Sequence, residues 1–222
     1  MKKIAFLFLL LISQLTLSQR TEKLEDFNKI TAFDQIDVWL VEAKENKIVL
    51  GGEGAEEVEI VNKNGELKIR MPLTKLLKGD NVSATVYYKK LDAVEANEGS
   101  RIASDITIKA TSFNVIAKEG AEIQLDVYVT SIKVKAANGS SVTIDGKATN
   151  QDIILNSGAM YFGSKLTTSI TTITVNAGGD ADVNASELVD AKVRAGGLIT
   201  VFGKPKQINQ KIIAGGRIEQ AK

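Results

Sequence analysis

The stretch ITVNAGGDADV, residues 173–183, contains the unit from which most of this chain is built. On each side of Gly178, two apolar residues alternate with polar ones. The same unit recurs between residues 91 and 222, and its central glycines are separated by 21, 19, 19, 20, 18 and 19 residues. A repeat of this length is typical of a supersecondary unit that stacks on its neighbours. The seven central glycines are Gly99, Gly120, Gly139, Gly158, Gly178, Gly196 and Gly215.

Aligning the repeats on these glycines places apolar residues in four columns. The columns lie five and three residues before the glycine and three and five residues after it, and they hold mainly Val, Ile, Leu and Ala. Residues two apart on a strand share one face of a sheet, so each repeat consists of two strands with one apolar face each. The pattern predicts an all-β solenoid, a parallel β-helix with two main sheets and about seven coils, in which a glycine forms the corner of each coil.

A corner between two sheets requires a positive φ angle or a close backbone approach, and glycine permits both. A glycine loop that holds a phosphate group would need a helix after it, and no segment after these glycines has helical periodicity. We therefore interpret the seven glycines as structural corners rather than as a cofactor site.

The chain before the repeats divides into three parts. Residues 1–18 have a basic start, an apolar stretch and small residues before a cut after Ser18, which is typical of a secretory signal peptide. Residues 19–32 are expected to form a polar lead-in, residues 33–90 an N-terminal β-strand part of about five short strands, and residues 91–222 the β-helix repeats. A signal peptide implies export, to the periplasm, the outer surface or the extracellular space.

Composition excludes several classes of function. The chain of 222 residues contains no histidine and no cysteine, which removes most hydrolase triads, most zinc sites and all disulfides. The net charge is only +1, which argues against a nucleic-acid partner. After the first segment, no apolar stretch is long enough for a transmembrane helix. We expect no cofactor, no metal and no catalytic residues.

Three residues are candidates for binding. Asp180 and Asp182 flank Ala181 just after a corner, and paired carboxylates can bind a cation or cleave a glycosidic bond, although solvated side chains are the simpler interpretation. Trp39 alternates with apolar neighbours, so its ring either forms part of an exposed binding face or packs under the lead-in. Tyr161 falls in an apolar column, and its ring is expected to point inward.

The N-terminal part and the first repeat also carry a family resemblance. The matching segments are Phe33 with residues 36–38, then residues 48–51, 65–69, 87–91 and 95–100, followed by the glycine corners. In this order they resemble the putative auto-transporter adhesin head, the GIN domain group of secreted Bacteroidetes proteins, over roughly residues 30 to 218. The resemblance implies a right-handed, two-sheeted β-helix, a role in adhesion and no catalytic residues. The chain departs from some relatives in having no cysteine for a lipid anchor.

These observations together predict a non-enzymatic secreted or surface β-helix protein that acts in adhesion or surface interaction, through repeated contacts along a rigid face. Its partners would be glycans or surface proteins, and assembly into a homo-oligomer stays open. Two alternatives remain at this point: a polysaccharide-binding or polysaccharide-cleaving protein that uses surface carboxylates, and a structural protein of the cell envelope.

Overall fold

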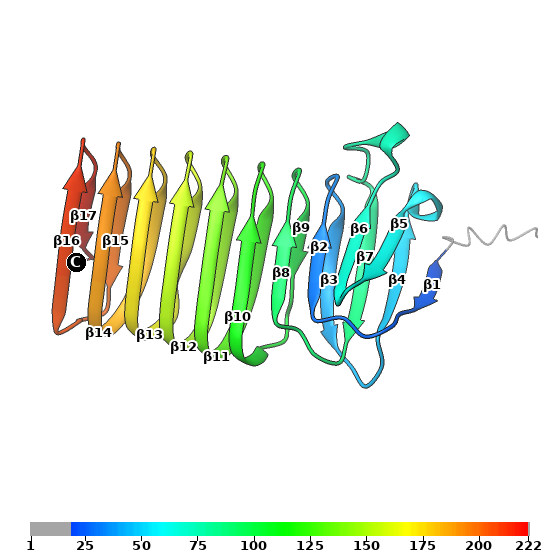
Figure 1. Ribbon diagram of the computed structural model, residues 1–222, viewed down its shortest axis with the longest axis horizontal. Helices are drawn as coiled ribbons and strands as arrows, with labels where there is room; N and C mark the ends of the chain where they lie inside the picture. Colours follow the sequence, from blue (N-terminus) through cyan, green and yellow to red (C-terminus); the bar gives the residue numbers. More distant parts are fainter. Residues whose placement is uncertain (1–18, 222) are drawn as a thin grey trace, which may run out of the picture.

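Two layers of β-strands face each other along the whole length of the computed structural model, which describes residues 19–221 (Figure 1). The expected signal peptide at residues 1–18 lies outside the described residues. The chain climbs one face, turns over the top, descends the other face and advances by one strand per coil, so the solenoid is right-handed (Figure 1). This is the hand that crossovers between parallel strands almost always adopt.

The strands and the two short 3-10 helices follow one another along the chain. They are β1 (Arg20–Lys23), β2 (Lys29–Ala32), β3 (Asp37–Glu42), β4 (Lys47–Gly52), η1 (Ala55–Glu57), β5 (Glu59–Lys63), β6 (Glu66–Arg70), η2 (Leu73–Lys75), β7 (Val82–Tyr88), β8 (Ala93–Ala96), β9 (Arg101–Ala103), β10 (Ile108–Ala117), β11 (Glu122–Ala137), β12 (Ser141–Asn156), β13 (Met160–Asn176), β14 (Asp180–Arg194), β15 (Leu198–Phe202), β16 (Gln207–Ile213) and β17 (Arg217–Gln220).

The pairings define the two layers. Layer one runs β5-β6-β2-β8-β10-β11-β12-β13-β14-β16, and layer two runs β1-β4-β7-β3-β9-β11-β12-β13-β14-β15-β17. The long strands β11 to β14 belong to both layers because each one bends from layer two into layer one. Each coil therefore has two corners, a tight turn at one edge and a bend in a strand at the other edge. We call the bend the second corner.

The tight turns confirm the role predicted for the glycines. All seven central glycines have φ between 70° and 87°, and the residue before each of them also has a positive φ, as in type I′ turns. Successive turns hydrogen bond to one another, as when the Gly99 N–H donates to the Glu119 carbonyl at 3.0 Å and the Gly120 N–H to the Asn138 carbonyl at 3.1 Å. The backbone ladder thus continues through the corners, which leaves few unpaired groups along this edge.

An eighth turn of the same kind contains no glycine. Asp34 and Gln35 have φ values of 59° and 66°, and the Ile36 N–H closes the turn on the Phe33 carbonyl at 3.2 Å. Strands β2 and β3 therefore form a first coil, which pairs in parallel with β8 and β9. The segment expected as a lead-in thus contains two strands, β1 and β2.

The apolar columns form the core between the layers. Every column position predicted from the sequence is buried except Gln210, Ile212 and Gln220, which lie in the last coil, where no described coil covers them. The Tyr161 ring points inward as predicted and is fully buried. Space for this ring comes from Gly163 on the same strand, since a Cβ atom at that position would overlap the ring.

The N-terminal end of the solenoid is closed by five strands, which we call the cap: β1, β4, β5, β6 and β7. Strands β6 and β7 pair in parallel with the first coil, whereas β4 and β5 run antiparallel to them and β1 runs antiparallel to β4. A tight turn at Asn64 and Gly65, both with positive φ, joins β5 to β6 in a hairpin. This reversal of direction ends the stack, so the cap covers the apolar interior of the first coil.

Candidate functional site

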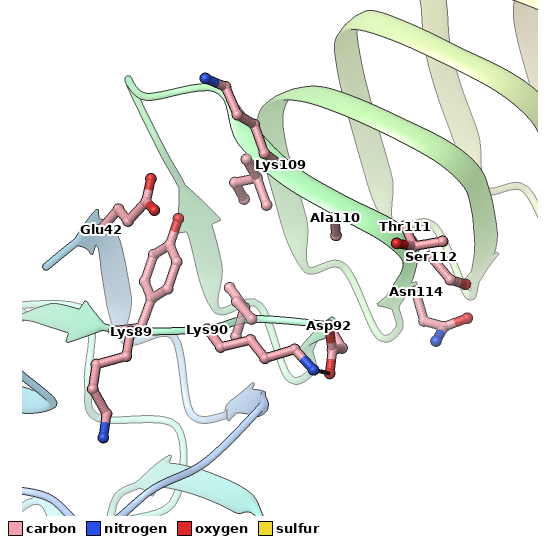
Figure 2. A pocket seen from close by; sticks show the side chains of 12 residues that line it. Glu42, Lys89, Lys90, Asp92, Lys109, Ala110, Thr111, Ser112 and Asn114 are labelled. Atoms are coloured by element: carbon pink, nitrogen blue, oxygen red, sulfur yellow. Dashed lines mark ion pairs between the residues drawn. The ribbon is translucent and has the colours of Figure 1, made fainter. Parts of the chain in front are cut away.

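A cavity opens where the cap meets the repeats. It has a volume of about 590 Å³ and lies among the end of β3, the connection from β7 to β8 and the beginning of β10 (Figure 2). Figure 2 shows Lys90 and Asp92 on the β7–β8 connection, facing the segment from Lys109 to Asn114. A volume of this size is in the range of ligand sites.

The cavity lies at an irregular second corner. Strands β11 to β14 each bend from layer two into layer one without interruption, but β9 ends at Ala103 and β10 begins only at Ile108, and β15 likewise ends at Phe202 before β16 begins at Gln207. Between β9 and β10 the Ser104 hydroxyl accepts the Ile106 N–H at 3.1 Å and donates to the Ile106 carbonyl at 2.9 Å, with the Leu40 carbonyl as a second acceptor at 3.3 Å. This local turn replaces the bend and leaves space beside the crossing segment 89–92.

The cavity has an apolar floor and a polar rim. Tyr88, Leu91 and Ile108 are buried, whereas the lysines, hydroxyl groups and amides around them are exposed. Burial, and then the charge of Glu42, raises the pKa of the Tyr88 phenol to about 12, so this group remains a hydrogen-bond donor at neutral pH. Such a combination can bind a polar ligand that also has apolar ring faces.

Two smaller cavities adjoin the first along the same edge. One, of about 400 Å³, shares Lys89 and Lys90 with it, and the other, of about 140 Å³, shares Ala110. We call the three cavities together the corner groove. Its lining residues are Asp26, Phe27, Asn28, Glu42, Asn46, Gly65, Tyr88, Lys89, Lys90, Leu91, Asp92, Ile108, Lys109, Ala110, Thr111, Ser112, Asn114, Tyr128, Val129, Thr130, Lys147, Ala148 and Thr149.

The corner groove has a modest excess of positive charge. Lys89 pairs with Asp26, and Lys90 pairs with Asp92 at 3.3 Å. Within residues 19–221, Lys109 and Lys147 have no carboxylate within 4.0 Å. These two ammonium groups are available to an anionic ligand.

The residues selected from the sequence lie on a different surface, the outer face of layer two. Trp39 is half-buried there, and its ring is covered by the Arg101 guanidinium at 5.1 Å, which also pairs with Asp37 at 3.2 Å. This contact explains the position of the ring, since a guanidinium over an indole face is favourable.

Asp180 and Asp182 lie on the same outer face, beside Met160 and Phe162 of β13. Burial, and then the charge of Asp180, raises the pKa of Asp182, partly offset by a hydrogen bond with Thr200. Trp39 and Asp182 follow one row of side chains but are five strand steps apart, about 24 Å at ~4.8 Å per step. The structure therefore does not bring the three predicted residues into one site, and none of them lines the corner groove.

The groove residues were missed by reasoning from the sequence, although one signal pointed to them. The spacing of 21 residues between Gly99 and Gly120 is the longest in the repeat, and it contains the irregular corner at residues 104–107. In the described part of the chain, no cluster of acidic side chains is arranged to hold a metal ion. No helix among these residues has both the length and the apolarity needed to cross a bilayer.

The fold and its corner groove define a class of protein, a β-solenoid whose N-terminal end is closed by a cap. The family model described as "Putative auto-transporter adhesin, head GIN domain" matches residues 26–205, so the chain belongs to this family. No match was found among the curated proteins.

Three solved structures share the fold. The putative adhesin from Bacteroides fragilis has a TM-score of 0.85 at 16% identity. Those from Parabacteroides merdae and Parabacteroides distasonis both have a TM-score of 0.76, at 16% and 19% identity. Each comparison covers 92% of this chain and 96% of the other. At these identities the likeness shows a common architecture.

Proposed function

We propose that this protein is a non-enzymatic adhesin of the cell surface that binds a linear, acidic glycan along the corner groove. The observation that carries the proposal is the row of three adjoining cavities at one edge of a rigid rod. The row extends from the first coil to β12, about four strand steps or ~19 Å. That length suits several units of a polymer rather than one small molecule.

The chemistry of the groove supports a glycan. Its rim provides hydroxyl and amide groups, among them Thr111, Ser112 and Asn114, which can exchange hydrogen bonds with sugar hydroxyls. Tyr128 is 60% exposed at the far cavity and offers an aromatic face to a sugar ring. Lys109 and Lys147 favour a ligand that carries carboxylate groups.

The same groove argues for binding without cleavage. Glycoside hydrolysis requires two carboxyl groups placed on either side of the bond. Asp92 is held by Lys90 and by the amide of Asn28 at 3.0 Å, and Asp26 pairs with Lys89. Among the groove carboxylates of the described chain, only Glu42 therefore has no ion-pair partner. One free carboxylate is fewer than the two that hydrolysis needs, which supports an adhesin rather than a hydrolase.

Calorimetric titration of residues 19–222 with hexagalacturonate, and with neutral cellohexaose for comparison, tests the proposal. We expect binding of the acidic oligomer, weakened at least tenfold by the double substitution Lys109→Ala and Lys147→Ala. The matched control is Lys133→Ala with Lys192→Ala, two lysines on the outer face of layer one, which should bind like the wild type. An equal loss of affinity for hexagalacturonate in both double variants would show that only the total charge of the protein matters. That result would contradict the proposal.

The outer face of layer two is the competing surface. If Trp39→Ala or the pair Asp180→Asn and Asp182→Asn abolished binding while the groove variant kept it, the ligand would lie on the surface selected from the sequence. Release of shorter products from hexagalacturonate, lost in the Asp180 and Asp182 variant, would favour the alternative of a polysaccharide-cleaving protein. A structural envelope protein would bind neither oligomer.

A further inference from the structure

The connection from β6 to β7, residues 71–81, projects from the edge of the tight turns (Figure 1). Three leucines of this connection are exposed to solvent: Leu73 at 78%, Leu76 at 51% and Leu77 at 52%. No other stretch of the described chain exposes three large apolar side chains within five residues. We call this segment the leucine loop.

The leucine side chains are exposed because hydrogen bonds fix the backbone of the loop in this conformation. Leu77 has a φ of 59°, a conformation that is unfavourable for a residue with a branched side chain. The carboxylate of Asp34, which is only 1% exposed, holds this conformation by accepting the N–H groups of Leu77 at 2.9 Å and Met71 at 3.0 Å. The Gly79 N–H also donates to the Asp34 carbonyl at 2.9 Å. The base of the loop is thus fixed while the leucines face outward.

We propose that the leucine loop inserts into the surface of a lipid bilayer. In Figure 1 the loop rises above the row of tight turns and above the connection from β4 to β5. Leu73 and Leu76 are exposed there and also line a cavity of about 200 Å³ with Phe33. A projecting loop with exposed leucines can enter the acyl boundary of a bilayer, which needs no matching cavity. Large apolar side chains with lysines beside them are typical of segments that lie in the membrane interface.

The charges around the tip fit a zwitterionic lipid. Lys75 and Lys78 belong to the loop itself, next to the leucines in the sequence, and both are exposed. Carboxylates of the β4–β5 connection lie beside them, where Glu57 pairs with Lys75 at 2.6 Å and Glu56 is exposed. Cations and anions are thus mixed beside the leucines, which suits a headgroup that carries both charges. The same carboxylates oppose a strongly anionic membrane.

The position of the loop is compatible with the proposed glycan site. The tight turns and the second corners form opposite edges of the solenoid, and the leucine loop and the corner groove lie on these opposite edges (Figure 1). Insertion of the loop would leave the groove facing away from the bilayer. The inference goes beyond the proposed function and does not depend on the identity of the glycan.

Sedimentation with neutral vesicles of phosphatidylcholine and phosphatidylethanolamine tests the proposal on residues 19–222. We expect the wild-type chain to bind, with at least a tenfold weaker partition for the triple variant Leu73→Ser, Leu76→Ser and Leu77→Ser. Partition should change less than twofold between low and high salt, because the leucines drive it. The matched control is Ile106→Ser with Ile170→Ser, two exposed apolar residues elsewhere (44% and 39%), which should bind like the wild type.

A second measurement reports insertion directly. Leu76→Trp, made in the Trp39→Phe background, should show a blue-shifted emission with these vesicles and quenching by brominated acyl chains. Absence of wild-type partition, equal partition of the triple variant, or an unshifted emission of the introduced tryptophan would each overturn the proposal. A wild-type dimer in sedimentation equilibrium that the triple variant converts to monomer would overturn it as well, since a second copy would then cover the loop. Glycan binding by the triple variant should stay unchanged, so failure of the lipid proposal and failure of the glycan proposal give different results.

Discussion

The coils from β10 to β15 and the N-terminal part from β1 to β9 are made of the same kinds of strand but differ in what they offer a ligand. The later coils share buried columns and closely spaced turns, with register shifts only between β12 and β13 and between β13 and β14. The N-terminal part contains the reversed strands of the cap, a long connection and an irregular second corner. The cavities of about 590 Å³ and about 400 Å³ and the leucine loop all involve this part.

The difference between the later coils and the N-terminal part indicates where a binding site can form in a solenoid. Repetition requires each coil to fit the next, so side chains at equivalent positions cover one another and few hollows form. A break in the repeat releases this constraint and leaves room for polar groups to converge. Substitutions in the regular scaffold and in the irregular part should therefore have different effects.

The largest expected effect concerns the regular coils. A Cβ atom added at Gly179 would lie 2.5 Å from the Ala159 carbonyl oxygen of the coil beneath, at a φ of 106°. Gly179→Ala should therefore lower the free energy of unfolding by about 3 kcal/mol or more. At the adjacent corner glycine, Gly178, nothing lies within 4 Å, and Gly178→Ala should cost only about 1 kcal/mol, from its positive φ alone. Denaturant unfolding of both variants measures the difference, and equal losses would contradict tight stacking of the turns.

A smaller loss is expected where the first coil holds the leucine loop. Asp34→Ala removes the acceptor of two backbone N–H groups and leaves the buried Met71 N–H without a partner, which should cost about 2–3 kcal/mol. Asp37→Ala, three residues away, removes a partly exposed ion pair with Arg101 and should cost less than about 1 kcal/mol. Thermal unfolding compares them. If Asp34→Ala were as mild as Asp37→Ala, the loop would not be anchored as we describe.

The smallest effect concerns an ion-pair network on the outer face of layer one. Burial of the Glu95 carboxyl acts to raise its pKa, but hydrogen bonds from Lys118 at 2.8 Å and Lys29 at 2.7 Å outweigh it, and the pKa lies below its ordinary value. A carboxyl group whose pKa is lower in the folded state than in the unfolded state stabilises the fold at pH values above its unfolded-state pKa. This stabilisation is lost as the pH falls through the folded-state pKa.

Glu95→Gln should consequently lower stability at pH 7 by up to about 1 kcal/mol, and the difference from wild type should shrink as the pH falls below about 4. Unfolding free energies measured from pH 7 down to pH 3 check this prediction. A difference that stayed constant over that range would show that the loss comes from packing and not from charge.

Much of the scaffold could be predicted from the sequence because its causes are local. Alternating apolar residues mark the buried face of each strand, and Gly178 and its equivalents mark the turns. The turn at Asp34 and Gln35 escaped prediction because no glycine marks it, although its backbone has the same conformation. The cap was harder still, since β6 lies between β5 and β2 only through pairing with segments far apart in the chain.

The binding surface could not be predicted for a related reason. Asp180, Asp182 and Trp39 are conspicuous as residue types, but each lies on a flat face whose neighbours already explain it. Lys109 and Lys147 are ordinary surface residues in the sequence, and they gain significance only from the cavities beside them. A site formed by a break in a repeat depends on the shape of the gap, which local sequence patterns do not describe.

Hydrogen–deuterium exchange with and without bound hexagalacturonate tests most directly whether the ligand binds at the break in the repeat. We predict slower exchange on binding at residues 89–92 and 108–114, with no change at the outer-face strands of residues 141–145 and 180–184. Protection confined to the regular coils, or spread evenly along the rod, would contradict the account.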